Sequence, residues 1–173
     1  MRKLYPLLSV LFLIYWGCED EQGTITLWGK EYSIENTTEL DLGSQGLTGS
    51  IPPEIGSLTN LRHLYLYNNQ FTGSIPSEIG NLTNLTSVSL YDNQLTGEIP
   101  SEIGNLTNLE RIKLHSNQFT GSIPETLCNL PNLTWSSEDS SFSVSTLYDN
   151  QLCPPYPSCI EDYVGEQDTS DCD

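Results

Sequence analysis

The sequence predicts an α/β repeat fold, a solenoid in which each repeating unit adds one strand to a parallel sheet. The first observation is a 24-residue unit that recurs in register at 61–84, 85–108 and 109–132, with a less regular copy at about 37–60. A constant period of this length is typical of solenoids, in which every unit buries its apolar side against its neighbours. The second observation is the alternation in Leu64-Tyr65-Leu66, where the leucines are expected to point inwards and the tyrosine outwards.

The chain opens with a segment typical of secretory leaders. A basic start at 1–3 precedes an apolar run at 4–16, which is too short to span a membrane. Gly17 and Cys18 follow this run, and an acidic, polar stretch comes next. The arrangement resembles a bacterial lipoprotein signal, which implies that residues 1–17 are removed, that Cys18 is acylated and that residues 18–23 form a tether. The alternative is an ordinary signal peptide with a spare cysteine.

Residues 24–36 are predicted to form an N-terminal cap. The alternation TITLW at its start favours a short strand. Because an open solenoid end exposes the core, Trp28 and Tyr32 are expected to cover the first repeat. The alternative interpretation is that these two aromatic side chains form a small binding site.

The repeats extend over residues 37–152 and follow the pattern LxxLxLxxNxLTGxIPxxIGxLTN. This pattern resembles the leucine-rich repeat, in particular its plant-type subclass, which carries the LTGxIP segment. The resemblance implies a right-handed leucine-rich repeat solenoid. Its features are a parallel concave sheet of about five strands and short helical or irregular turns on the convex side.

Two positions of each unit have a predicted physical role. An asparagine where the chain leaves the strand can bond turn backbone groups that would be costly to bury unpaired. Repetition would make a ladder of such residues: Asn69, Asn93, Asn117 and Asn150. Proline disfavours α-helix immediately before it and can begin a short helical turn. The prolines concerned are Pro52, Pro76, Pro100 and Pro124.

The register breaks once, after Asn132. The spacing from Asn117 to Asn150 exceeds the repeat length by nine residues, which places an insertion within 133–141. One interpretation is a functional loop that protrudes next to the last strand. The other is a cap element, in which Trp135 shields the end of the stack.

Acylation of Cys18 would leave an even number of cysteines, which can pair in an oxidising compartment: Cys128, Cys153, Cys159 and Cys172. Residues 153–173 resemble the cysteine-containing C-terminal caps of secreted leucine-rich repeat proteins. The register brings Cys128 and Cys159 close together on the convex side of adjacent units, which favours the pairs Cys128–Cys159 and Cys153–Cys172. The alternative pair is Cys153–Cys159, because its spacing resembles a pairing in the family's caps.

The outward positions of the strands form columns, and one column is rich in aromatic residues. Tyr67, Tyr91, His115 and Tyr148 would line up across four neighbouring strands. Exposed aromatic side chains on a rigid sheet are typical of recognition surfaces, although tyrosine is also simply a good strand former. Arg111 and Lys113 share a strand with His115 and would give a positive spot. The predicted ligand-binding residues are Tyr65, Tyr67, Tyr91, Arg111, Lys113, His115 and Tyr148.

The net charge is −17, and it becomes −19 when Arg2 and Lys3 leave with the leader. Such a charge repels nucleic acid and anionic membranes. The sequence has two histidines and lacks GxSxG, HExxH, P-loop and CxxC motifs, so no catalytic residue, cofactor or metal site is expected.

The sequence therefore predicts a non-enzymatic recognition or adhesion module at a bacterial cell surface or in the periplasm. It would be exported and would contact the membrane only through the lipid on Cys18. The expected ligand is a protein or peptide. Binding of a glycan and a passive structural role are the alternatives.

Overall fold

The computed structural model describes residues 23–137 and 144–172. Residues 1–22, which include Cys18, lie outside this description, as do residues 138–143 of the predicted insertion and residue 173. The leader, the acylation of Cys18 and the tether therefore stay predictions. Within the described ranges, no helix is both long and apolar enough to cross a bilayer.

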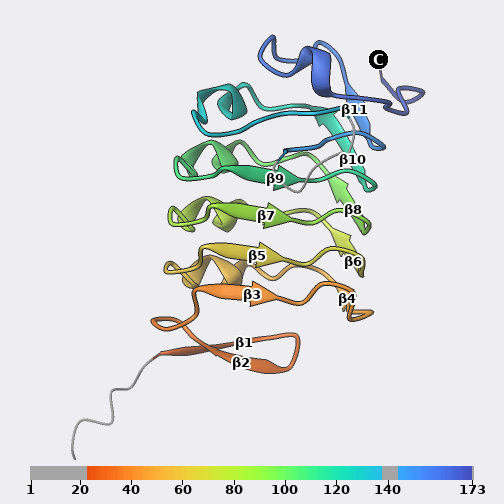
Figure 1. Cartoon of the computed structure of the whole chain (residues 1–173). Coiled ribbons are helices and arrows are strands. Elements are labelled where there is room, and N and C mark those ends of the chain that lie inside the picture. The colour runs from red at the N-terminus through yellow and green to blue at the C-terminus, as the bar shows by residue number, and fades with distance from the viewer. Residues whose placement is uncertain (1–22, 138–143, 173) are drawn as a thin grey trace, which may run out of the picture.

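One strand from each of four successive units forms a parallel sheet in the described chain, which we call the first sheet. Its order is β3 (Glu39–Asp41), β5 (His63–Tyr65), β7 (Ser87–Ser89) and β9 (Arg111–Lys113). The fifth unit joins β9 through a parallel bridge between Lys113 and Thr146. Figure 1 shows these strands stacked along one side of the solenoid. The predicted fold class is confirmed, with a bridging segment in place of a full fifth strand.

A second parallel sheet, which the sequence analysis did not predict, runs along another side of the stack (Figure 1). Among the described residues its order is β4 (Thr48–Gly49), β6 (Gln70–Gly73), β8 (Gln94–Gly97), β10 (Gln118–Ser122) and β11 (Gln151–Cys153). Phe71 in β6 and Leu95 in β8 are fully buried between more exposed neighbours. β4, β6, β8 and β10 contain the threonine and glycine of the LTG part of the repeat, and β11 is the equivalent stretch of the fifth unit.

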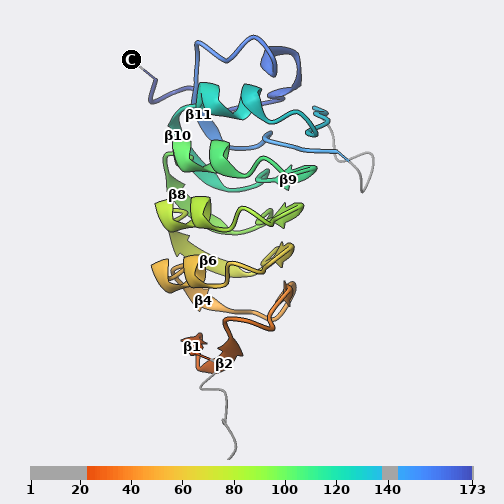
Figure 2. The same cartoon turned by 90° about the vertical axis from the view of Figure 1, so that its left-hand side faces the viewer.

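Short 3-10 helices close the remaining side of the stack, as Figure 2 shows. They are η1 (Pro53–Ser57), η2 (Ser77–Asn81), η3 (Ser101–Asn105) and η4 (Glu125–Asn129). Each follows a proline in extended conformation, such as Pro76 with φ −68° and ψ 142°. The ring fixes φ and removes the backbone donor, so the helix begins after it. The predicted short helical turns are therefore present.

A glycine within the helical turn sets how closely the units stack. A Cβ on Gly80 would lie 2.7 Å from the backbone oxygen of Glu102, and one on Gly56 would lie 2.6 Å from that of Glu78. Any side chain at these positions would push the next turn away. Cys128 occupies the same position in the fourth unit, where the C-terminal cap follows instead of another such turn.

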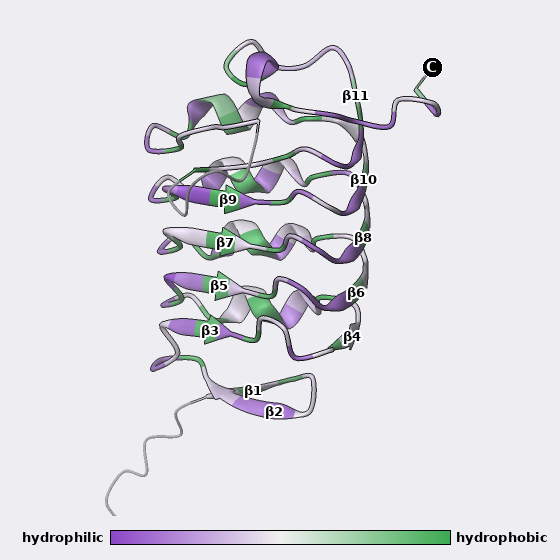
Figure 3. Ribbon diagram, turned by 45° about the vertical axis from the view of Figure 1, so that its right-hand side comes forward, coloured by the Kyte–Doolittle hydropathy of each residue, from purple (hydrophilic) through white to green (hydrophobic). Residues whose placement is uncertain are grey.

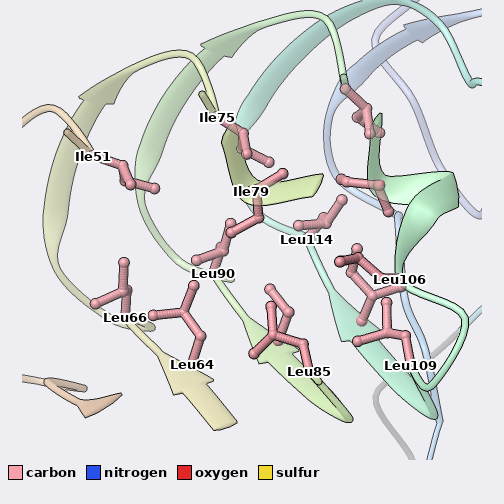
Figure 4. Close-up of a cluster of buried hydrophobic side chains, with 14 of the residues drawn as sticks. Ile51, Leu64, Leu66, Ile75, Ile79, Leu85, Leu90, Leu106, Leu109 and Leu114 are labelled. Atoms are coloured by element: carbon pink, nitrogen blue, oxygen red, sulfur yellow. The ribbon is translucent and has the colours of Figure 1, made fainter. Parts of the chain in front are cut away.

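The core is a continuous apolar column between the three sides. Leu64, Leu66 and Leu85 are fully buried, and Figure 4 shows them in the same interior as Ile79. Figure 3 shows that β9 has a hydrophobic middle residue between hydrophilic ones, which matches the burial of Ile112. Each unit thus buries its apolar face against its neighbours, the main stabilising contribution in a solenoid.

The predicted asparagine ladder is present. Oδ1 of Asn93 accepts a hydrogen bond from the Phe71 N–H at 3.1 Å, and its Nδ2 donates to the carbonyls of Leu66 and Leu90 at 3.0 Å each. The same arrangement recurs in the neighbouring units, at Asn69, Asn117 and Asn150. Every buried side-chain nitrogen and oxygen in the described ranges has a hydrogen-bond partner.

The C-terminal cap extends this ladder by one step. Oε1 of Gln167 accepts a hydrogen bond from the Leu152 N–H at 3.2 Å, and its Nε2 donates to the Leu147 carbonyl at 3.0 Å. A parallel bridge between Asn150 and Gln167 holds this segment against the last unit. A cap glutamine thus supplies the amide that the asparagine of a further repeat would have supplied.

The N-terminal segment is an antiparallel hairpin of β1 (Thr24–Leu27) and β2 (Lys30–Ser33), rather than a single short strand. The Trp28 ring lies 5.1 Å from that of Phe71, and its Nε1 donates to the Ser50 carbonyl at 3.1 Å. Tyr32 packs half-buried against the core, and this burial raises the pKa of its phenol. These contacts favour the capping interpretation over an aromatic binding site.

Two disulfides hold the C-terminal segment, and they are the favoured pairs Cys128–Cys159 and Cys153–Cys172. The segment also contains η5 (Glu161–Tyr163), and Ile160 beside it is fully buried. Tyr156 donates its hydroxyl hydrogen to the Leu152 carbonyl, and burial raises the pKa of this phenol.

The described part of the predicted insertion, residues 133–137, lies close to the fifth unit. Trp135 is half-buried against the core and forms a parallel bridge with Ser145. Ser145 is fully buried, and its hydroxyl accepts a hydrogen bond from the Ile112 N–H at 3.1 Å. Trp135 therefore packs between the core and the fifth unit, and its predicted role as a cap element stays a prediction.

Candidate ligand-binding face

The first sheet places the predicted site residues in columns. Strand pairing aligns Asp41, Tyr65, Ser89 and Lys113 across β3, β5, β7 and β9. The same pairing aligns Glu39, His63, Ser87 and Arg111 in a parallel column. The side chains of these columns point to the face opposite the buried leucines, because successive residues of a strand alternate between faces. We call this surface the strand face.

Just beyond the strands, four rings form a continuous aromatic stack: Tyr67, Tyr91, His115 and Tyr148. Their successive centroids are 5.0, 4.7 and 4.5 Å apart, and their planes differ by 7°, 8° and 21°. This spacing follows from the separation of paired strands, about 4.8 Å. The outer face of Tyr67 lies over Gly43, where an added Cβ would be 2.4 Å from the ring. The faces of neighbouring rings therefore pack against one another, and the outer face of Tyr67 packs against Gly43.

Burial corrects one part of the predicted site. Lys113 is 7% exposed and His115 is 4% exposed, so neither offers the open positive surface that the sequence suggested. His115 lies between the rings of Tyr91 and Tyr148, and its Nδ1 is 2.6 Å from the hydroxyl oxygen of Thr146. Nζ of Lys113 lies 6.0 Å from the Tyr91 ring centroid, beside the bridge to Thr146. The fifth unit thus pairs with the backbone of Lys113 and contacts the side chain of His115.

Arg111 stays half-buried on the strand face. Its Nε donates to the Ser87 hydroxyl at 3.5 Å, a long contact that leaves most of its five donors to other partners or solvent. Tyr65 is half-buried as well, and its ring stacks on His63 with 5.9 Å between centroids.

A hollow of about 380 Å³ opens over β7, and we call it the β7 trough. Its floor is Ser87 and Ser89, the two outward residues of β7, which are much smaller than their neighbours on β5 and β9. The complete lining is Asp41, Tyr65, Tyr67, Ser87, Ser89, Tyr91, Arg111 and Lys113. Five of these are predicted site residues. Two of them, Tyr67 and Tyr91, belong to the aromatic stack, which closes one end of the trough.

Three lining residues, Asp41, Ser87 and Ser89, are not among the predicted site residues. The available signal was a strand with two outward serines between strands with bulky outward residues. A row of small side chains between large ones makes a depression on any sheet.

The turns after the four strands of the first sheet, and the turn after the bridging segment of the fifth unit, have an uncommon backbone conformation. The first residue of each turn has φ between 52° and 57°, in the left-handed region, and the residues are Ser44, Asn68, Asp92, Ser116 and Asp149. Asparagine and aspartate tolerate this region better than most residues. Nδ2 of Asn68 donates to the Ser44 hydroxyl at 3.0 Å, which links two successive turns. The repeated turn fixes the edge of the strand face.

A second hollow of about 910 Å³ lies between the last unit and the C-terminal cap. Its lining includes the acidic residues Asp149, Glu166 and Asp168. Hydrogen bonds from the Ser170 side chain and backbone lower the pKa of the Asp168 carboxyl. No group of three or more histidine, cysteine, aspartate or glutamate side chains within the described residues has a metal-binding arrangement.

The stacked, periodic geometry agrees with comparisons to known families. A model named Leucine Rich repeats (2 copies) matches residues 59–102, and one named Leucine Rich Repeat matches residues 36–58 and 108–130. Together these matches span just over half of the chain. No curated protein matches the sequence significantly.

Several solved structures from Arabidopsis thaliana are similar. The leucine-rich repeat ectodomain of the receptor kinase GASSHO1/SCHENGEN3, in complex with CASPARIAN STRIP INTEGRITY FACTOR 2, has 39% identity and a TM-score of 0.55. That match covers 61% of this chain and 12% of the ectodomain. The ectodomain of the receptor kinase SOBIR1 has 32% identity and a TM-score of 0.59, with 73% of this chain and 65% of that chain covered.

A chain of the BIR3–SERK2 complex has 30% identity and a TM-score of 0.57, with 75% of this chain and 62% of that chain covered. The protein thus spans less than two thirds of the length of each of these three structures. The repeats, the two family matches and these likenesses agree, and the chain belongs to the leucine-rich repeat family.

Proposed function

We propose that this protein recognises a peptide or an extended protein segment on its strand face. The observation that carries the proposal is the β7 trough, a hollow of about 380 Å³ closed at one end by the aromatic stack. Tyrosine and arginine are enriched at the energetically important positions of interfaces, and Tyr65, Tyr67 and Arg111 are half-buried here. A rigid face also reduces the entropy lost on binding.

Similar structures support this proposal at the level of the domain. GASSHO1/SCHENGEN3 was solved with CASPARIAN STRIP INTEGRITY FACTOR 2, and the BIR3–SERK2 structure is a complex of two proteins. These partners belong to those proteins. The LTGxIP segments, which form the second sheet here, favour the plant-type subclass of repeats.

The stacking geometry favours a peptide over a glycan. Sugar rings pack on the open faces of aromatic side chains, whereas Tyr67 and Tyr91 lie face to face with 7° between their planes. The edges of these rings, rather than their faces, line the β7 trough. A polypeptide offers amides and side chains that suit such edges and the serine hydroxyls beside them.

We further propose that the protein is exported and attached to a bacterial membrane through acylated Cys18, at the cell surface or facing the periplasm. Two disulfides favour an oxidising compartment. Pairing of the other four cysteines leaves Cys18 as the single cysteine for acylation. The boundaries proposed for the leader, tether, N-terminal cap, repeats and C-terminal cap are 1–17, 18–23, 24–36, 37–152 and 153–173.

The test is an affinity capture from the native community or host, with wild-type protein compared with Tyr67→Ala. Tyr163→Ala is the matched control, since Tyr163 is 42% exposed on the C-terminal cap. A specific protein or peptide should be lost with Tyr67→Ala and kept with Tyr163→Ala. Equal capture by both variants, with unchanged folding, would refute binding on the strand face. A glycan array on the same proteins tests the alternative ligand class.

A further inference from the structure

The walls of the β7 trough are made of aromatic edges. Tyr67 and Tyr91 stack on each other, the outer face of Tyr67 lies over Gly43, and the outer face of Tyr91 lies against His115. The parts of these rings that line the trough are therefore their edges. The edge of an aromatic ring carries partial positive charge, and its preferred partner is the negative face of another ring.

The rest of the lining suits a flat group. Arg111 borders the trough opposite Tyr65, and its planar guanidinium can lie on an aromatic face. Ser87 and Ser89 form a low floor that does not obstruct a ring. The volume of about 380 Å³ accommodates one large side chain, and a buried aromatic side chain contributes more contact area than any other residue type.

Two other kinds of side chain fit less well. A carboxylate could pair with Arg111, but it would leave the ring faces and edges without an aromatic partner and would meet Asp41 in the same lining and a chain with a net charge of −17. A branched aliphatic side chain would fill the space but could not use the ring edges or the guanidinium. Among neutral groups, an aromatic ring is the one that can contact the tyrosine edges, the Arg111 guanidinium and the serine floor together.

We propose that the β7 trough is the anchor subsite of the strand face and receives an aromatic side chain of the partner, with its ring face against the edges of Tyr67 and Tyr91. The proposal rests on the proposed function, since it names the part of a peptide or protein ligand that this face selects.

The experiment is a titration of the isotope-labelled full-length chain with three small probes, followed by nuclear magnetic resonance. The probes are N-acetyl-phenylalaninamide, N-acetyl-leucinamide and N-acetyl-glutamic acid amide. The phenylalanine probe should shift the backbone amide signals of Ser87 and Ser89, with a dissociation constant of about 1 mM for a ligand of this size. The other two probes should bind roughly two- to tenfold more weakly. Equal binding of the leucine probe, or no shift at these serines, would overturn the proposal.

A pair of variants tests whether the phenylalanine probe binds in the trough or elsewhere on the protein. Ser89→Leu should fill the trough and abolish the shifts caused by the phenylalanine probe. Ser74→Leu makes the same change at an exposed residue beyond β6 and should leave those shifts intact. Loss of the shifts in Ser74→Leu, or their persistence in Ser89→Leu, would contradict the assignment.

Failure of the anchor-subsite proposal can be distinguished from failure of the proposed function. If the protein captured by wild type is lost with Tyr67→Ala but kept with Ser89→Leu, the strand face binds its partner and the trough is not the anchor. If neither variant changes capture, the proposed function fails as well.

Discussion

Replacement of Asn93 by leucine tests the asparagine ladder, because the hydrogen bonds lost can be followed one by one. Oδ1 of Asn93 is the acceptor for the N–H of Phe71, a residue with 0% exposure. Nδ2 of Asn93 donates to three carbonyls, and each of these keeps another donor. Leu66 retains Asn69, Leu90 retains Asn117, and Tyr91 retains the N–H of Asn68.

The substitution therefore leaves one buried donor unsatisfied, the Phe71 N–H. An unsatisfied buried donor costs about 1–3 kcal/mol. In a domain of this size, 1 kcal/mol lowers the melting temperature by about 2–4 °C, so the expected decrease is about 2–12 °C. Melting of the variant can be followed by circular dichroism, together with chemical denaturation of the same sample.

The matched control is Asn105→Leu. Asn105 ends η3 and is exposed, and a surface substitution of this kind usually changes stability by less than about 0.5 kcal/mol. If Asn93→Leu melts at the same temperature as Asn105→Leu, the ladder does not contribute to stability as argued.

Three further substitutions have defined outcomes. Gln167→Leu removes the acceptor for the Leu152 N–H and should lower stability by about 1–3 kcal/mol; unchanged hydrogen-exchange protection at Leu152 would argue against the cap extending the ladder. Gly80→Ala places a Cβ 2.7 Å from the Glu102 backbone oxygen, and denaturation should show a loss of about 1–3 kcal/mol; a wild-type midpoint would mean that the turns have room to separate. Cys18→Ser should stop incorporation of labelled fatty acid and release the protein without altering its melting temperature, and labelling that persists would exclude Cys18 as the acylated residue.

The repeat sequence determines what is periodic in this fold. The alternation around Leu64 and the 24-residue spacing were enough to predict the first sheet, the ladder and the alignment of Tyr67 with Tyr91. The register also placed Cys128 and Cys159 close together on the convex side of adjacent units, and this favoured pair is present together with Cys153–Cys172. Each of these features depends only on which residues occupy equivalent places.

Features that depend on what surrounds a position were not predictable in the same way. Lys113 and His115 occupy outward positions, yet both are buried, and the fifth unit pairs with the backbone of Lys113 and brings the Thr146 hydroxyl to His115. The second sheet depends on the left-handed turn at residues such as Asn68, which redirects the chain so that β6 can pair with β4 and β8. The β7 trough depends on size differences between neighbouring strands, which become apparent only when the outward residues of β5, β7 and β9 are compared with one another.

The aromatic stack and the asparagine ladder are one structural unit rather than two. In each of four units, the asparagine two residues after a stacked ring donates from Nδ2 to the carbonyl of that ring's own residue. The distances are 3.1 Å for Asn69 to Tyr67, 3.3 Å for Asn93 to Tyr91, 3.2 Å for Asn117 to His115 and 3.2 Å for Asn150 to Tyr148. The buried amides thus fix the backbone from which the rings project, and the rings inherit the spacing of the ladder. Because a preorganised surface loses less entropy on binding, a ladder substitution should weaken ligand binding at Tyr91 even where no ligand reaches the asparagine.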